Sequence, residues 1–144
     1  INTEIRDTDI VFIDPSENSH WLYDRIGQLC TQINFDKYQF DLSHFQPFQY
    51  GKYKKEGHYD WHTDSGPTLQ EHRKLTFVVG LSDPDDYEGG EFQINSSEEK
   101  FAETIHTKKG KAILFPSFML HRVAPVTKGK RKSLVVWVTG PKFL

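Results

Sequence analysis

From about residue 45 onward the chain is a succession of short apolar runs, each bounded by glycine, proline, aspartate or asparagine. The runs are rich in valine, isoleucine, phenylalanine, tyrosine and threonine, which fit a pleated, half-buried surface. Strands of this length separated by turns predict a jelly roll or a closed barrel, which can enclose a site at one mouth. The eight runs are Phe48–Tyr53, His58–Thr63, Lys74–Leu81, Glu91–Ile94, Phe101–His106, Ala112–Phe115, Leu120–Val126 and Ser133–Thr139.

The segment before these runs predicts one strand and one helix. Ile10–Ile13 is apolar, and Asp14, Pro15 and Ser16 offer caps for a helix over about residues 16–35, whose apolar residues recur near the helical period. The 144 residues suffice for one compact domain and are too few for two ordinary ones. We therefore expect a single domain over 1–144, with an N-terminal helix packed on a β-barrel core at about 45–140.

Several classes of protein are excluded by composition. No uncharged apolar run approaches the roughly 20 residues that span a bilayer, and Ile1–Glu4 lacks the basic and apolar regions of a signal peptide. The single cysteine, Cys30, allows no internal disulfide and no cysteine-rich zinc site, and its apolar neighbours predict a core thiol. We expect a cytoplasmic protein without a membrane segment.

The net charge of -2 conceals a strong asymmetry along the chain. All 20 acidic residues lie in 1–103, whereas residues 104–144 contain basic residues and no acidic one. The basic stretch could be a solvated face, a nucleic-acid surface or a site for a small dianion. We do not expect nucleic-acid binding, because the aromatic residues are spread through the strands instead of accompanying the basic cluster. The basic residues are Lys108, Lys109, Lys111, Arg122, Lys128, Lys130, Arg131, Lys132 and Lys142.

A histidine followed two residues later by an aspartate occurs twice, as His58–Asp60 and His62–Asp64. Alternate residues of a strand share a face, so each pair could offer an imidazole and a carboxylate to one metal ion. One ion cannot take all four, since His58 and Asp64 would lie roughly 20 Å apart. We favour His62 and Asp64 because they adjoin a turn at the expected barrel mouth. The third ligand is expected from a distant strand, with His121 the best candidate; two imidazoles and one carboxylate suit non-haem Fe(II).

Three segments then resemble a known family. Tyr53–Asp64, Leu75–Glu91 with its Asp-Tyr-Glu-Gly-Gly-Glu ending, and Phe115–Ser133 are similar, in this order, to the Fe(II)/2-oxoglutarate-dependent dioxygenases of the prolyl 4-hydroxylase-like group. The resemblance covers about residues 45–140. It implies a double-stranded β-helix, a jelly-roll or cupin-like fold. It assigns the iron to His62, Asp64 and His121 as catalytic metal ligands.

The resemblance also implies how the cosubstrate is held. A 2-oxoglutarate molecule bound to the iron leaves a distal carboxylate, and Arg131 stands ten residues after His121, at the family's spacing for the basic residue that binds it. An arginine offers a rigid bidentate fork for a carboxylate. Ser133, on the same strand face, could donate a second hydrogen bond. Tyr53 matches the tyrosine that lines the family's cosubstrate pocket.

Three further residues are candidates for substrate contact through the same resemblance. Trp137 falls where prolyl hydroxylases place an aromatic wall, Arg73 lies near a substrate-contacting arginine of relatives, and Tyr59 precedes the first metal ligand as in the family pattern. Trp137 and Tyr59 also have an alternative as packing residues of the core.

The expected activity is hydroxylation of a C–H bond with O2, releasing succinate and CO2, with ascorbate as a reductant. Retention of Asp64 favours hydroxylation, because halogenating relatives replace this carboxylate with a small residue. A prolyl residue of a protein or peptide is the first choice of substrate, and another side chain or a free amino acid is the second. The alternative of a different class is a non-catalytic metal-binding jelly roll, against which Arg131 and Ser133 argue.

Overall fold

The computed structural model describes residues 5–66, 72–95 and 102–143, and it is mostly β with one α-helix in that part of the chain. The helix α1 spans His20–Ile33 and continues into a π-helical turn, Asn34–Tyr38, while a short 3-10 turn covers Pro84–Asp86. The strands are β1 Arg6–Asp7, β2 Asp9–Ile13, β3 His44–Phe45, β4 Phe48–Tyr53, β5 His58–His62, β6 His72–Gly80, β7 Tyr87–Gly89, β8 Phe92–Asn95, β9 Glu103–Ile105, β10 Ala112–Pro116, β11 Leu120–Val123, β12 Val126–Gly129 and β13 Arg131–Gly140.

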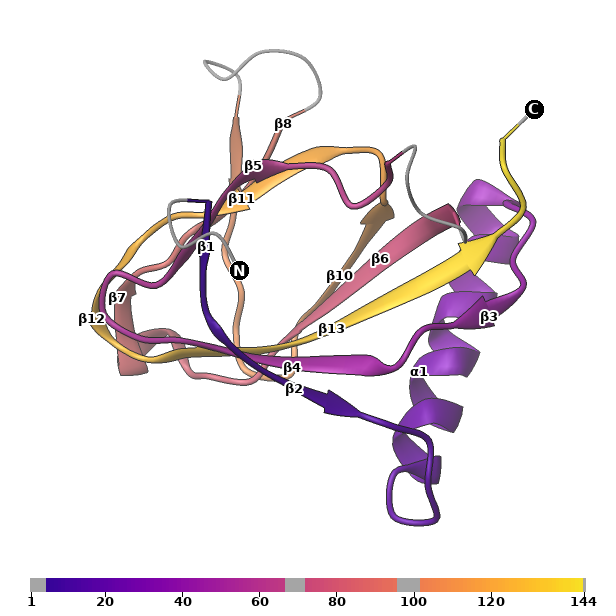
Figure 1. Ribbon diagram of the computed structural model, residues 1–144, viewed down its shortest axis with the longest axis horizontal. Coiled ribbons are helices and arrows are strands. Elements are labelled where there is room, and N and C mark those ends of the chain that lie inside the picture. Colours follow the sequence, from indigo (N-terminus) through magenta and orange to yellow (C-terminus); the bar gives the residue numbers. More distant parts are fainter. Residues whose placement is uncertain (1–4, 67–71, 96–101, 144) are drawn as a thin grey trace.

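Two antiparallel sheets face one another, as the double-stranded β-helix expectation requires (Figure 1). The smaller sheet has the order β1-β5-β11-β8-β9, and the larger has the order β10-β6-β13-β4-β2, with β3 also paired to β13. β7 and β12 form a separate two-stranded pair. Neighbours in both sheets are often distant in the sequence, so the layers bring residues from the two halves of the chain together.

The larger sheet separates two apolar clusters, and β13 contributes to both. Leu134, Val136 and Val138 pack with Ile26 and Cys30 of α1 on the outer face. The second cluster fills the space between the sheets around Val78, Phe92, Phe115 and Val123. Because strand residues alternate between faces, the odd-numbered residues of β13 point into the barrel and its even-numbered residues hold the helix.

The predicted helix differs from the observed one at its start. The first helical residue is His20 instead of about residue 16, because Ser16 and Ser19 form a turn of their own: the Ser16 amide donates to Ser19 Oγ at 2.9 Å, and Ser19 Oγ donates to the Asp14 carbonyl at 2.8 Å. The predicted core position of Cys30 is confirmed, since its side chain is fully buried and burial raises the pKa of the thiol to about 12.

The predicted strands are confirmed in place, with corrections at a few ends. The run Leu120–Val126 is two strands, because Pro125 has no amide hydrogen to continue a ladder. The run predicted to begin at Phe101 forms a strand from Glu103, and Phe101 lies outside the described residues. The short strands β1, β3 and β7 were not predicted. No helix in the described part of the chain is long and apolar enough to cross a bilayer.

Candidate functional site

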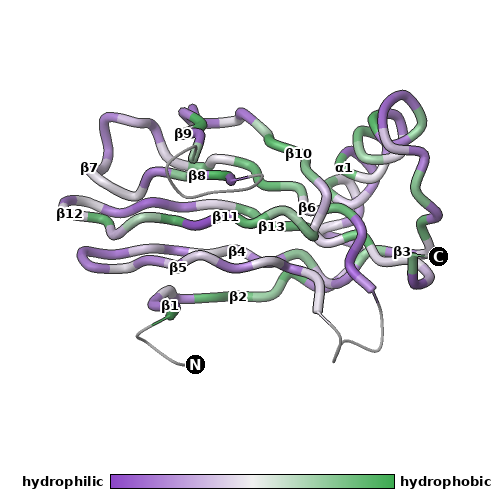
Figure 2. The backbone as a smooth tube through the Cα atoms, turned by 90° about the horizontal axis from the view of Figure 1, so that it is seen from above, coloured by the Kyte–Doolittle hydropathy of each residue, from purple (hydrophilic) through white to green (hydrophobic). Residues whose placement is uncertain are grey.

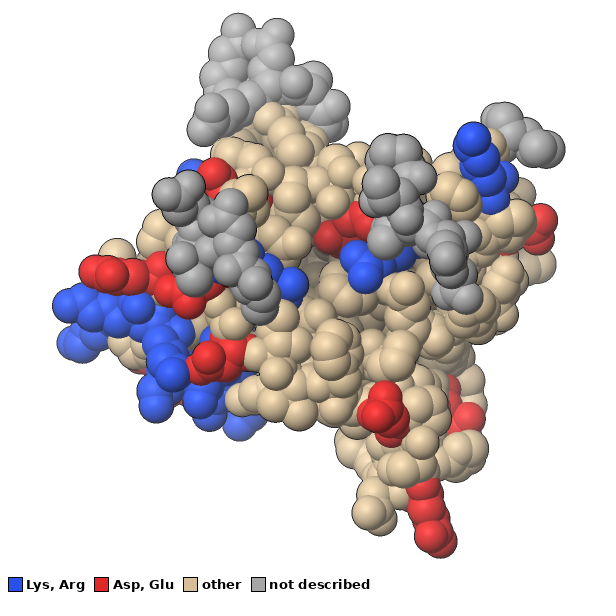
Figure 3. Space-filling model, viewed as in Figure 1, with Lys and Arg blue, Asp and Glu red and all other residues tan. Residues whose placement is uncertain are grey.

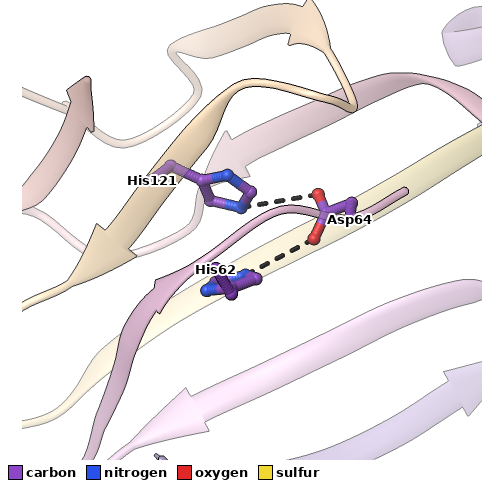
Figure 4. Close-up of side chains that lie close together, drawn as sticks. All are labelled: His62, Asp64 and His121. Atoms are coloured by element: carbon purple, nitrogen blue, oxygen red, sulfur yellow. Dashed lines mark ion pairs between the residues drawn. The ribbon is translucent and has the colours of Figure 1, made fainter. Parts of the chain in front are cut away.

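Antiparallel pairing of β5 with β11 brings together two histidines that are far apart in the sequence. His62, at the end of β5, pairs in register with His121 of β11, and their ring centroids lie 4.2 Å apart. The chain turns inward after His62, so Asp64 lies between the two imidazoles (Figure 4). The Nε2 atom of His62 is 3.4 Å from Asp64 Oδ1, and that of His121 is 3.4 Å from Asp64 Oδ2.

A β-bulge in β5 decides which of the two His-x-Asp pairs faces the barrel. His121 pairs with His62 and Val123 pairs with Tyr59, so two residues of β5, Asp60 and Trp61, stand opposite one residue of β11. The extra residue places Tyr59 and His62 on the same inner face, where their rings stack at 3.5 Å, and it leaves Asp60 exposed. The two pairs therefore do not lie on one face, although their residue numbers have the same parity, because simple alternation ends at the bulge.

A backbone carbonyl orients each histidine ring so that Nε2 faces the position of a metal ion. His62 Nδ1 lies 2.6 Å from the Asp60 carbonyl oxygen, and His121 Nδ1 lies 2.9 Å from the Met119 carbonyl oxygen. A carbonyl oxygen can only accept, so each Nδ1 carries the hydrogen and donates it. The Nε2 atoms therefore face Asp64, where each can carry a hydrogen toward the carboxylate and where a metal ion would take the place of that hydrogen.

Asp64 is buried, with 7% of its surface exposed. Burial alone would raise the pKa of its carboxyl group, but the hydrogen bonds and charges of His121 and His62 outweigh burial and hold the pKa well below its ordinary value. The carboxylate is thus ionised and ready to act as a ligand at neutral pH.

A buried hydroxyl group, supported by a second one, orients the carboxylate. Thr76 Oγ1 donates to Asp64 Oδ2 at 2.8 Å and lies 2.9 Å from Ser117 Oγ. The Asp64 amide donates to the Ser117 carbonyl at 2.9 Å, which fixes the backbone as well. Thr76 and Ser117 are both almost completely buried, so the network is shielded from water.

The three side chains can hold a divalent metal ion. One ligand atom from each of His62, Asp64 and His121 lies within 4.8 Å of the others. Two imidazoles and one carboxylate on one side of an ion leave its remaining positions open to small molecules. Among the described residues this is the one group of three or more such side chains with this spacing.

The candidate metal ligands open into a cavity between the sheets, here called the inner cavity, with an empty volume of about 420 Å³. The lining residues are Arg6, Gln49, Tyr53, Tyr59, His62, Asp64, Thr76, Val78, Phe92, His121, Val123, Arg131, Ser133, Val135 and Trp137.

Arg131 is a buried cation in this cavity. Only 3% of its surface is exposed, and its Nε atom is buried with no hydrogen-bond partner in the described structure. Tyr53 pairs with it across β4 and β13, with the guanidinium carbon 5.4 Å from the tyrosine ring centroid. Ser133 lies on the same face and is also buried, whereas Lys132 between them is exposed. A buried, incompletely paired guanidinium is costly unless an anion completes it.

Gly90 shows why a glycine stands in the Asp-Tyr-Glu-Gly-Gly-Glu segment. Its φ of +65° is in the left-handed region, and a Cβ atom there would lie 3.2 Å from Arg131 Cδ and 3.0 Å from Val126 Cγ2. Only glycine adopts this conformation freely and leaves room for the arginine side chain.

Two of the three substrate candidates line the inner cavity and the third lies beside it. Tyr59 and Trp137 are part of its wall, and the Trp137 side chain is also largely buried, so it is both a wall and a packing residue. Arg73 does not line the inner cavity, but its guanidinium carbon lies 3.6 Å from the Trp137 ring centroid. Burial lowers the pKa of Arg73 and raises the pKa of Tyr59.

Sequence reasoning missed three polar residues of the cavity. Thr76 lies two positions before Val78 on β6, and the alternation of that run could have indicated its inward face. Gln49 is almost fully buried within a run predicted correctly. Arg6 had no signal, because a two-residue strand leaves no periodic pattern.

Comparison with known proteins identifies the family. The family model described as the 2OG-Fe(II) oxygenase superfamily matches residues 48–139. A PKHD-type hydroxylase from Synechococcus sp. is 38% identical over 91 residues, which are 63% of this chain and 40% of that protein. One from Teredinibacter turnerae is 36% identical over 97 residues, 64% of this chain and 42% of that protein. The chain thus spans about two fifths of the length of these relatives.

Solved structures share the fold. A prolyl-4-hydroxylase from Pseudomonas putida superposes with a TM-score of 0.80 at 22% identity, covering 98% of this chain and 76% of that chain. A prolyl hydroxylase from Trichoplax adhaerens, solved with a hypoxia inducible factor peptide fragment, superposes with a TM-score of 0.78 at 20% identity, covering 94% and 64%. At these identities the similarity concerns the fold alone.

The first prediction concerns metal binding. Co(II) binding, followed by the visible absorption of the ion, should weaken in each of the variants His62→Ala, Asp64→Ala and His121→Ala. The loss of affinity should exceed the roughly 10–100-fold that results when a residue hydrogen-bonded to a metal ligand is removed. His58→Ala is the matched control, because His58 belongs to the other His-x-Asp pair and does not line the inner cavity. Equal Co(II) affinity in the His62 and His58 variants would contradict the assignment.

The second prediction concerns the hydroxyl network. Thr76→Val removes the hydroxyl donor to Asp64 while nearly preserving volume, so Co(II) affinity should fall by roughly 10–100-fold. Thr76→Ser keeps the hydroxyl group and should bind Co(II) nearly as the original protein does. If Thr76→Val lowers only the melting temperature and leaves Co(II) affinity and absorption unchanged, the hydroxyl group supports the core and not the metal ligand.

Proposed function

The chain belongs to the 2OG-Fe(II) oxygenase superfamily, and on that premise we propose that it is a 2-oxoglutarate-dependent dioxygenase that hydroxylates a C–H bond. The observation that carries the proposal is one cavity that combines three metal-ligand side chains with a buried, incompletely paired arginine. A structural metal site needs no such buried cation, so the non-catalytic alternative leaves Arg131 unexplained.

Fe(II) is the proposed ion, held by His62, Asp64 and His121. The donor set is the two-histidine, one-carboxylate triad typical of non-haem Fe(II) oxygenases. The Nδ1 hydrogen bonds and the Thr76 hydroxyl group hold the three ligands in place before the ion binds, which lowers the ordering cost of binding. Imidazole Nε2 atoms without protons and an ionised carboxylate are the protonation states that metal binding requires.

The cosubstrate proposal rests on Arg131, Ser133 and Tyr53. A guanidinium fork and a hydroxyl group on one strand face offer donors for the distal carboxylate of 2-oxoglutarate. Apolar side chains of the cavity, including Val78 and Val135, suit the methylene groups of that molecule and exclude water.

When bound, iron with 2-oxoglutarate and O2 supplies the oxidising chemistry that inserts oxygen into a C–H bond, with succinate and CO2 as the other products. The residues of this chain orient the cosubstrate and shield the site from water. Asp64 occupies the third protein ligand position, which favours hydroxylation over halogenation. Burial of Arg131 fixes the direction in which 2-oxoglutarate enters. The distal carboxylate of that molecule loses its water inside the cavity, and the guanidinium group supplies the counter-charge that it needs there.

A prolyl residue of a protein or peptide is the proposed substrate. Its support is the similarity to proteins named PKHD-type hydroxylase, the shared fold with prolyl hydroxylases, and an aromatic wall formed by Trp137 at the cavity. The alternative substrate for the same chemistry is another type of amino-acid side chain or a free amino acid.

The third prediction tests the cosubstrate site. Arg131→Ala should raise the KM for 2-oxoglutarate about 100-fold, because loss of a charge-assisted bidentate pair costs roughly 3 kcal/mol. Succinate formation with Fe(II), 2-oxoglutarate and ascorbate is the measurement. Lys132→Ala, the exposed neighbour on the same strand, should keep the original KM. Retained Co(II) binding shows that each variant is folded, and equal KM values in both would reject the role of Arg131.

The fourth prediction tests the reaction and the substrate together. Proline-containing peptides incubated with Fe(II), 2-oxoglutarate and ascorbate should gain the mass of one oxygen atom on proline, in step with succinate formation, and the Asp64→Ala variant should produce neither. An oxygen atom on another residue would move the proposal to the alternative substrate. Identical results for the Asp64→Ala variant and the original protein would reject the proposed chemistry.

A further inference from the structure

Two arginines lie where the inner cavity opens to the surface. A second cavity, here called the outer cavity, adjoins the inner one and shares Arg6, Gln49, Tyr59 and Trp137 with it. Arg73 lines the outer cavity from the start of β6. In the space-filling view a hollow near the centre of this face has lysine or arginine atoms on two sides (Figure 3).

Each guanidinium group is held in place by an aromatic ring. The Arg6 guanidinium carbon lies 4.6 Å from the centroid of Tyr59, its partner across β1 and β5, and Arg73 lies 3.6 Å from that of Trp137. Arg73 Nε also donates to Gln46 Oε1 at 2.8 Å. Such stacking fixes the plane of a guanidinium while its remaining N–H groups stay available to a ligand.

A bulge in β6 aims Arg73 at this opening. Val138 pairs with Leu75 and Thr139 pairs with Arg73, so Lys74 is the extra residue. Without the bulge, alternation from Thr76 would place Lys74 on the inner face and Arg73 on the outer one. The register shift therefore presents a guanidinium, which can form a bidentate pair, in place of an ammonium group.

Among the described residues, the acid whose charge acts on Arg73 is Asp64, which also contacts the two histidines. Within the described residues neither guanidinium forms an ion pair, and Arg6 Nε is buried with no hydrogen-bond partner. Asp64 is the one carboxylate in the described lining of the two cavities, and both its oxygens face the histidines. Two cations at a partly desolvated opening attract an anion from solution.

We propose that Arg6 and Arg73 bind a carboxylate side chain of an acidic peptide, next to the residue that enters the inner cavity. The inference rests on the proposed function, because it names the class of peptide that the same site accepts. Each stacked guanidinium group offers a fork of N–H donors to a carboxylate, and a carboxylate bound there would orient the peptide before the reaction.

The surroundings of the two arginines favour a peptide over a small carboxylic acid. The outer cavity continues past them along β2, where Ile10 and Phe12 line it and Phe12 is 59% exposed. β2 is the edge strand of the larger sheet and is apolar over most of its length (Figure 2). A small acid would leave this apolar surface in water, whereas an extended peptide covers it with neighbouring side chains.

The fifth prediction is a difference in binding between paired peptides. Short proline-containing peptides that differ only by aspartate or asparagine beside the proline, labelled with an uncharged dye, are titrated with protein loaded with Mn(II) and N-oxalylglycine. Fluorescence polarisation should give about 10-fold tighter binding of the aspartate form, because hydrogen bonds to charged groups exceed neutral ones. Arg6→Gln and Arg73→Gln should each reduce this preference, and the double variant should abolish it.

Arg122→Gln is the matched control. Arg122 also lies over an aromatic ring, at 5.0 Å from the Trp61 centroid, and its Nε donates to Gln93 Oε1 at 2.6 Å, yet it lines neither cavity. This variant has the same change of charge and should keep the aspartate preference. Unchanged Co(II) absorption shows that each variant retains the metal site.

Equal binding of both peptide forms by the original protein, or a preference that survives the double variant, would overturn the inference. Competition by N-acetylaspartate as strong as that by the peptide would overturn the choice of a peptide ligand. These results are separate from failure of the proposed function, which is an absence of succinate formation with every peptide tested.

Discussion

The pairing of β5 with β11 is the interaction on which the site depends. It places His62 opposite His121, and the bulge at Asp60 and Trp61 turns His62 toward the barrel together with Tyr59. Asp64 can then reach both imidazoles from the turn that follows. A shift of this register by one residue would place the β5 side chains on the opposite face and separate His62 from His121. The core residues on either side, Phe92 and Phe115 against His121, make such a shift costly.

A single strand, β13, connects the fold to the proposed chemistry. Its even-numbered residues bury the helix against the larger sheet, and its odd-numbered residues supply Arg131, Ser133 and Trp137 to the cavity. The apolar packing on one face fixes the polar side chains on the other. This rigidity matters because a buried guanidinium with an unpartnered Nε is tolerated only where the surrounding structure holds it.

The arginines at the two cavities lie at separate positions, and each position is proposed to bind a different carboxylate. Arg131 and Trp137 stand six residues apart on β13, a distance of roughly 20 Å along a strand. The cosubstrate carboxylate is assigned to Arg131, and the peptide carboxylate to Arg6 and Arg73 beside Trp137. The other basic residues of the C-terminal stretch do not line the inner cavity, so the charge asymmetry of the sequence is mostly a property of the surface.

Alternation alone predicted most of the strands, because a strand with one buried face has a strict period of two. The inward positions of Arg131 and Ser133 were expected from the family resemblance, and alternation only placed those two residues on one face. The adjoining turn and the family resemblance favoured His62–Asp64 over His58–Asp60 before the fold was known. The sequence did not show the bulge in β5, the position of Arg6 or the hydroxyl group of Thr76. Those were decided by the tertiary structure. A bulge exists only relative to a partner strand, and a two-residue strand such as β1 forms only because β5 is already there to pair with it.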